Sequence, residues 1–179
     1  MKTNLEIEFK TAIDEKTYKK MINKFNLENS ILKQTNHYFD TENEDLINQK
    51  IVLRIRQKDD QYKLTSKTHT PEGALERHLY LTKDEALDML ENGFDASIIN
   101  IGYNVEKIAE LTTFRASVAY SGGKLFFDKS IYYNHTDYEI EYEAHDKDLG
   151  IKIFEEFLQE NDIKYSKMIS KAKRAYMAK

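Results

Sequence analysis

The sequence contains no cysteine, no tryptophan and one proline in 179 residues. Without cysteine there are no disulfides, thiol nucleophiles or thiolate metal sites, so a metal ion must be held by oxygen atoms or by histidine. No apolar run approaches the roughly 18 residues of a membrane-spanning helix. The first residues also lack the apolar segment of a secretory signal. We therefore expect a cytoplasmic protein with no membrane partner.

Neither sign of charge dominates the composition. The chain has 31 acidic and 27 basic residues, a formal net charge of −4. A protein that wraps a long stretch of nucleic acid needs a net basic face, so extended nucleic-acid binding is disfavoured. The length favours one domain over residues 1–179, and the sequence leaves the oligomeric state open.

Hydrophobic periodicity predicts an α+β fold dominated by antiparallel sheet. Alternating patterns predict strands at 3–10, 33–40, 51–58, 62–68, 74–81, 124–128 and 136–144, with one long strand or two short ones at 104–120. Helical patterns predict helices at 14–26, 82–92, 95–101, 147–160 and 166–177. On the last of these, Lys167, Lys171 and Arg174 would share one face.

Charges of one sign are sorted by strand. Four strands carry like charges on one face: Glu6 and Glu8; Arg54 and Arg56; Lys63 and Lys67; Glu139, Glu141 and Glu143. Like charges two positions apart, as on three of these strands, lie about 7 Å from each other on that face and repel. One such strand is typical of a solvated sheet face with cross-strand ion pairs. Four of them favour charged faces that point together into a groove or a barrel lumen, where bases bind a polyanion and acids bind a hard cation.

Short motifs along nearly the whole chain resemble one family. They are Glu6-Ile7-Glu8-Phe9-Lys10, Tyr38-Phe39-Asp40-Thr41, Leu53-Arg54-Ile55-Arg56, Leu64-Thr65-Ser66-Lys67, Glu76, Arg115, Asp128, Glu139-Ile140-Glu141, and Ser170-Lys171 with Arg174. In this order they resemble the CYTH superfamily, the triphosphate tunnel metalloenzymes, which is named after class IV adenylyl cyclase and thiamine triphosphatase. The chain is most similar to the short single-domain bacterial members.

The resemblance implies a closed eight-stranded antiparallel β-barrel that forms a tunnel, with helices packed outside. It implies an enzyme that hydrolyses a small triphosphate, whether inorganic, thiamine or nucleoside triphosphate, with Mg²⁺ or Mn²⁺. Two alternatives remain open: a class IV-type adenylyl cyclase that makes cyclic AMP from ATP, and a non-catalytic binder of triphosphate or polyphosphate.

The resemblance also implies roles for individual residues. The metal ligands would be Glu6, Glu8, Glu139 and Glu141, with Asp128 nearby. The substrate ligands would be Lys10, Arg54, Arg56, Lys67 and Arg115, with Lys171 on a helix that plugs or lines the tunnel; Lys63, Glu76, Glu143 and Arg174 match by parity or neighbourhood. The catalytic set would be Glu6, Glu8, Lys10, Arg54, Arg56, Lys67 and Arg115. The sequence assigns no role to His78, Tyr132 or Glu143.

Overall fold

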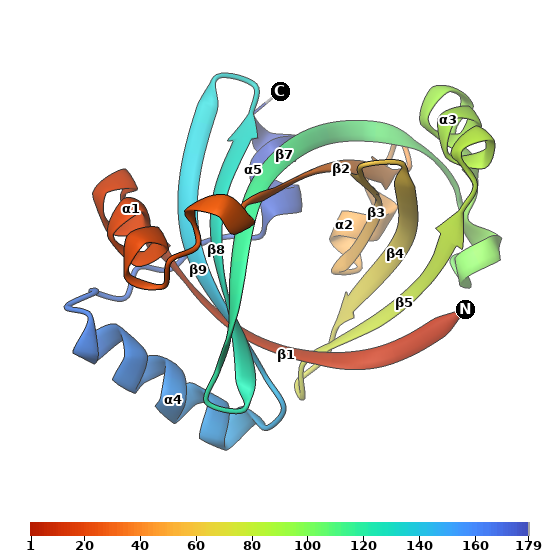
Figure 1. The fold of residues 1–179 in the computed structure, drawn as a ribbon. Coiled ribbons are helices and arrows are strands. Elements are labelled where there is room, and N and C mark those ends of the chain that lie inside the picture. The colour runs from red at the N-terminus through yellow and green to blue at the C-terminus, as the bar shows by residue number, and fades with distance from the viewer. Residues whose placement is uncertain (179) are drawn as a thin grey trace.

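Eight antiparallel strands close into a barrel in the computed structural model, which describes residues 1–178 (Figure 1). The strand order is β2-β3-β4-β5-β1-β9-β8-β7, and pairing of β2 with β7 closes the ring. The strands are β1 (Lys2–Ile13), β2 (Leu32–Asp40), β3 (Ile51–Lys58), β4 (Gln61–His69), β5 (Ala74–Leu81), β7 (Asn104–Tyr120), β8 (Gly123–Tyr132) and β9 (His135–Ala144). The two-residue β6 (Phe94–Asp95) pairs with the start of β7 outside the ring. The predicted fold class is confirmed.

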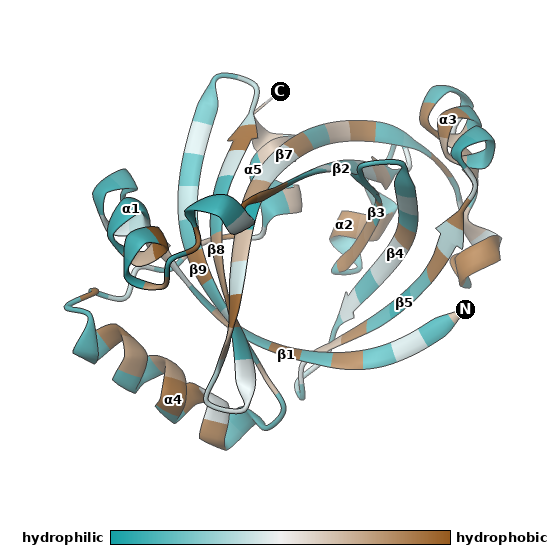
Figure 2. Cartoon of the chain, in the orientation of Figure 1, coloured by the Kyte–Doolittle hydropathy of each residue, from teal (hydrophilic) through white to brown (hydrophobic). Residues whose placement is uncertain are grey.

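The charged face of each strand turns inward. Residues directly opposite one another in an antiparallel pair share a face, and Arg56 lies opposite Lys63 while Glu8 lies opposite Glu143. Hydrophilic and hydrophobic residues alternate along the strands (Figure 2). The lumen is therefore polar, and the apolar side chains point outward, where helices must cover them.

Two apolar clusters between the barrel and its outer helices make up most of the core. One lies beneath α1 (Glu15–Lys24) and α4 (Lys147–Glu160), where Phe127 and Phe157 are fully buried. The other lies beneath α2 (Asp45–Asn48), α3 (Lys83–Asn92) and the 3₁₀ helix η2 (Ala96–Ile99), and it includes the buried Leu46, Leu53 and Leu64. Burying each such side chain contributes about 1.5–3 kcal/mol. The core thus holds the ring from outside and leaves the lumen free for charged groups.

A C-terminal helix, α5 (Lys171–Met177), fills one end of the lumen. Its Ala175 is fully buried against Tyr38, Leu111 and Tyr132, in a small cluster inside the ring. Figure 1 shows α5 behind the opening that faces the viewer. The helix therefore places its first residues at the floor of the tunnel.

The predicted helix at 166–177 is wrong over its first turn, because residues 166–170 are not helical. Ser166 instead docks on β1: its amide donates to Thr11 Oγ1 at 2.8 Å, and its carbonyl accepts from the Ala12 amide at 2.9 Å. Ser170 caps α5 by accepting from the Lys173 amide. Lys167 consequently lies outside the helix and shares no helical face with Lys171.

Other boundaries also differ from the sequence prediction. The expected helix at 95–101 is the shorter η2, and the strand expected at 124–128 continues to Tyr132 as β8. Residues 104–120 form one long strand rather than two. No periodicity in the sequence predicted the 3₁₀ helix η1 (Glu28–Ser30), α2 or β6. Within the described residues, none of the helices combines the length and apolarity needed to cross a bilayer.

Candidate active site

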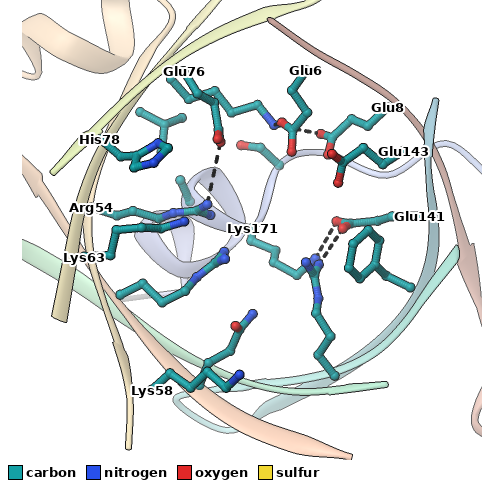
Figure 3. A pocket seen from close by; sticks show the side chains of 18 of the residues that line it. Glu6, Glu8, Arg54, Lys58, Lys63, Glu76, His78, Glu141, Glu143 and Lys171 are labelled. Carbon is teal, nitrogen blue, oxygen red and sulfur yellow. Dashed lines mark hydrogen bonds and ion pairs between the residues drawn. The ribbon is translucent and has the colours of Figure 1, made fainter. Parts of the chain in front are cut away.

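The barrel lumen contains a cavity of about 550 Å³. Most of the predicted site residues line it: Glu6, Glu8, Lys10, Arg54, Arg56, Lys63, Lys67, Glu76, Arg115, Glu141 and Lys171. Three predicted residues, Asp128, Glu139 and Arg174, are buried beside the cavity and do not line it. In Figure 3, Arg54, Lys58 and Lys63 lie across the cavity from Glu8, Glu141 and Glu143. The lumen therefore has one basic and one acidic wall.

Several lining residues were not predicted as site residues. Lys58 continues the alternation of Arg54 and Arg56 along β3. Lys124, on β8, lies opposite Glu143 on β9. The positions of Lys58 and Lys124 in the strand alternation could have predicted that they face the lumen, but neither residue belongs to a family motif. His78 and Glu143, left without a role by the sequence, both line the cavity.

On the acidic wall, two carboxylates share one lysine. Lys67 Nζ donates to Glu6 and, at 3.1 Å, to Glu8 Oε1, and Lys10 Nζ lies 3.7 Å from Glu8. Burial raises the pKa of Glu6, and the charge of Glu8 raises it further. Burial also raises the pKa of Glu8, but Lys67 and Lys10 outweigh that effect and hold it below its usual range. The two lysines therefore offset the repulsion between the carboxylates of this wall only in part.

At the tunnel floor, three carboxylates surround one ammonium group. Ligand oxygens of Asp128, Glu139 and Glu141 lie within 4.8 Å of one another, close enough to hold a metal ion. Lys171 Nζ contacts all three, at 2.8 Å from Asp128 and 2.7 Å from Glu141. Arg115 donates to both Asp128 oxygens, at 2.7 and 2.6 Å, and to Glu141. The cluster is therefore largely neutralised by the protein's own cations.

A second network anchors α5. Arg174 donates to Asp137 Oδ2 at 2.9 Å and to Glu139, and the Tyr132 hydroxyl also donates to Asp137. Burial and the hydrogen bond to Asp137 raise the pKa of Tyr132 to about 12. Arg174 and Tyr132 contact the same carboxylate, that of Asp137, and so hold α5 in place. Neither residue lines the lumen cavity.

We expect Lys171→Met to destabilise the protein by about 3 kcal/mol, which lowers Tm by roughly 6–12 °C, because buried carboxylates lose their shared cation. Burial already raises the pKa of Glu139 to about 7, and loss of Lys171 raises it further. A raised folded-state pKa makes stability fall as pH rises from the unfolded value. The deficit should therefore be small near pH 5 and largest above neutrality. Thermal melts from pH 5 to 8 test this.

The matched control for that variant is Lys173→Met, because Lys173 is exposed on the same helix. Its melts should follow those of the unmodified protein at every pH. Equal melting curves for Lys171→Met and Lys173→Met would contradict the role of Lys171 as the counter-ion of the floor.

The cations of the basic wall have fewer carboxylate partners than those of the acidic wall and the tunnel floor. Arg56 Nε donates to Asn36 Oδ1 at 2.9 Å, and the guanidinium forms no ion pair with any carboxylate of residues 1–178. Arg54 lies 3.8 Å from Glu76. Burial, with the charges of Arg54 and Arg115, lowers the pKa of Arg56 to about 9. Burial and the two β3 arginines also lower the pKa of Lys63. An anionic ligand would relieve this repulsion.

Comparisons with known proteins agree with this architecture. A family model described as the CYTH domain matches residues 4–176. "Putative triphosphatase YjbK" of Bacillus subtilis (strain 168) is 33% identical over 186 residues, covering 100% of this chain and 98% of the relative. The crystal structure of a "putative adenylate cyclase" from Bacillus halodurans superposes with a TM-score of 0.88 at 33% identity, over 97% of this chain and 98% of that one.

A more distant structure shares the fold. It comes from Hippeastrum and is described as a "putative adenylyl cyclase" that "reveals a dominant" triphosphatase activity. The TM-score is 0.75 at 21% identity, with 97% of this chain and 96% of that one covered. At this identity the likeness shows the shared barrel.

Proposed function

The chain belongs to the CYTH domain family, and we propose that it is a divalent-metal-dependent hydrolase of a small triphosphate, with inorganic triphosphate as the preferred substrate. The observation that carries the proposal is the basic wall, where Arg56 and Lys63 face each other across β3 and β4 with no carboxylate partner among residues 1–178. Directly opposed like charges destabilise a sheet. A polyanion in the lumen removes that cost. The triphosphatase named among the relatives supports the same assignment.

The acidic wall fits a divalent cation. Glu6 and Glu8 offer carboxylate oxygens, the ligands that Mg²⁺ and Mn²⁺ prefer, and Glu141 reaches the same space from β9. Burial, and after it the charge of Glu8, raises the pKa of Glu6, and a bound cation would offset both effects. We assign the first metal position to these three residues. Asp128 and Glu139 would join the ligand set only after Lys171 released them.

Charge placement accounts for the chemistry. When bound, the divalent ion would neutralise negative charge on the phosphate oxygens. Arg54 and Arg56 each present a planar fork of donors that suits a phosphate group, and Lys63 adds a point charge. Phosphoryl transfer depends mainly on such positioning and neutralisation. We assign the orientation of the attacking water to the carboxylates of the acidic wall.

The surroundings of Phe126 favour hydrolysis of inorganic triphosphate over cyclisation of ATP. Phe126 lines the cavity, but Arg115 lies over its ring at 4.3 Å from the centroid and Lys124 at 5.3 Å. These cations compete for the ring surface on which an adenine base would stack. A cyclase needs the base and ribose held in place, whereas inorganic triphosphate needs neither.

A phosphate-release assay together with a cyclic-AMP assay tests the proposal. The panel contains inorganic, thiamine and nucleoside triphosphates, each with Mg²⁺, with Mn²⁺ and with a chelator. We expect metal-dependent release of orthophosphate, fastest from inorganic triphosphate, and no cyclic AMP. Formation of cyclic AMP as the main product would favour the cyclase, and binding without turnover would favour a non-catalytic binder.

A further inference from the structure

Buried polar atoms without hydrogen-bond partners gather on one wall of the lumen. They include the Tyr38 hydroxyl, Arg54 Nε, Thr65 Oγ1 and His78 Nδ1. The strand register places them in one line, because Tyr38 lies opposite Arg54, Arg54 opposite Thr65, and Thr65 opposite His78. We call these four residues the donor row. It crosses β2, β3, β4 and β5 on the face that bears the basic wall.

Two residues of the donor row are neutral and deeply buried. Tyr38 is 2% exposed and Thr65 is 1% exposed. Thr65 shares the lumen face with Lys63 and Lys67, which flank it at alternate positions along β4 and line the cavity. Tyr38 lines the cavity itself. Tyr38 therefore lies at the lumen wall, and Thr65 lies on the lumen face of β4 between two residues that line the cavity. Neither hydroxyl has a hydrogen-bond partner among the described residues.

Other hydroxyls on the same barrel do have hydrogen-bond partners on neighbouring strands. Thr113 and Ser130 meet across β7 and β8 at 3.4 Å, and Thr35 meets Thr112 at 3.1 Å. Buried polar groups nearly always find a partner, and leaving one unpaired is unfavourable. A row of unpaired groups on a single wall therefore indicates a ligand with acceptor atoms.

We propose that the donor row binds the non-bridging oxygens of the triphosphate, with the hydroxyls of Tyr38 and Thr65 donating to them; the identity of the ligand rests on the proposed function. Arg54 Nε adds a charged donor within the same line. Neutral donors suit this position because the basic wall already carries Arg54, Arg56 and Lys63. Further cations would increase their mutual repulsion, whereas hydroxyls add hydrogen bonds without adding charge.

The test uses Thr65→Val and Tyr38→Phe, which remove one hydroxyl each and keep the shape of the side chain. Calorimetry with inorganic triphosphate on metal-free protein measures affinity, and thermal melts of the ligand-free protein measure stability. We expect about tenfold weaker binding for each variant, as for the loss of one hydrogen bond to a charged group. The ligand-free Tm should be equal or higher, because an unpaired buried hydroxyl is removed. A purely structural hydroxyl would give the opposite pattern, with lower Tm and normal affinity.

Ser66→Ala is the matched control. Ser66 neighbours Thr65, is 1% exposed and also has an unpartnered hydroxyl, but it points away from the lumen. Its removal should leave triphosphate affinity unchanged. If Thr65→Val and Tyr38→Phe both bind triphosphate as the unmodified protein does, or weaken no more than Ser66→Ala, the donor row is overturned and the proposed function stands. If the unmodified protein fails to bind triphosphate, the proposed function falls and the inference falls with it.

Discussion

Replacing Arg56 by methionine is expected to lower kcat/KM on inorganic triphosphate about 1000-fold while raising the Tm of the ligand-free protein. Arg56 faces Lys63 across the strand pair, and within residues 1–178 its side chain has only the neutral Asn36 as a hydrogen-bond partner. Its lowered pKa shows that the charged guanidinium is unfavourable in the lumen without a ligand. Methionine removes that penalty, and a gain of about 1 kcal/mol would raise Tm by roughly 2–4 °C. The transition state, however, loses a charged fork, and arginines in that role contribute at least 1000-fold to phosphoryl transfer.

Steady-state kinetics and thermal melts measure the two effects in parallel. The matched control is Arg77→Met, because Arg77 lies on β5 between the lumen-facing Glu76 and His78 and therefore points outward. Its kcat/KM should stay unchanged. Normal kinetics combined with a lower Tm in Arg56→Met would show that Arg56 is a structural residue and would contradict the role of the basic wall.

Glu8→Gln is expected to reduce metal-dependent turnover about 1000-fold and to abolish the rise in Tm that we expect Mg²⁺ to produce in the unmodified protein. Lys67 and Lys10 keep the pKa of Glu8 below its usual range, so the carboxylate is ionised at neutral pH and able to bind a cation. Glutamine keeps the shape and an acceptor for Lys67 but removes the charge. Losing the metal would forfeit several kcal/mol of charge stabilisation in the transition state.

The measurement for Glu8→Gln is a Mg²⁺ titration followed by thermal melts, with triphosphate turnover assayed alongside. Glu110→Gln is the control, since Glu110 also has two basic partners, His37 at 3.0 Å and Lys107 at 3.6 Å, but is half exposed and does not line the lumen. The control should keep the metal-induced rise in Tm. A full rise in Glu8→Gln as well would exclude Glu8 as a metal ligand.

The strand parity in the sequence predicted which side chains face the lumen. Glu8 and Glu143 meet as opposed residues, and so do Arg56 and Lys63, because alternation is a local property of a strand. Family motifs added which strands come together. Both signals are carried by residues a few positions apart, so a single sequence contains them.

Other features depend on contacts between distant segments. The first turn of the last predicted helix is replaced by an extended segment because Ser166 bonds to Thr11, which is 155 residues away. The compensation of Asp128 by Lys171 likewise depends on how α5 enters the barrel. The hydroxyl of Thr65 has no hydrogen-bond partner among the described residues, and a local sequence pattern cannot predict that a partner is missing.

A crystal structure of the protein with inorganic triphosphate and Mn²⁺ tests the central claim most directly, because anomalous scattering locates the metal. We expect phosphate groups against Arg54, Arg56 and Lys63, with Mn²⁺ between them and the carboxylates of Glu6 and Glu8. Triphosphate bound outside the barrel, or Mn²⁺ held away from the acidic wall, would contradict it.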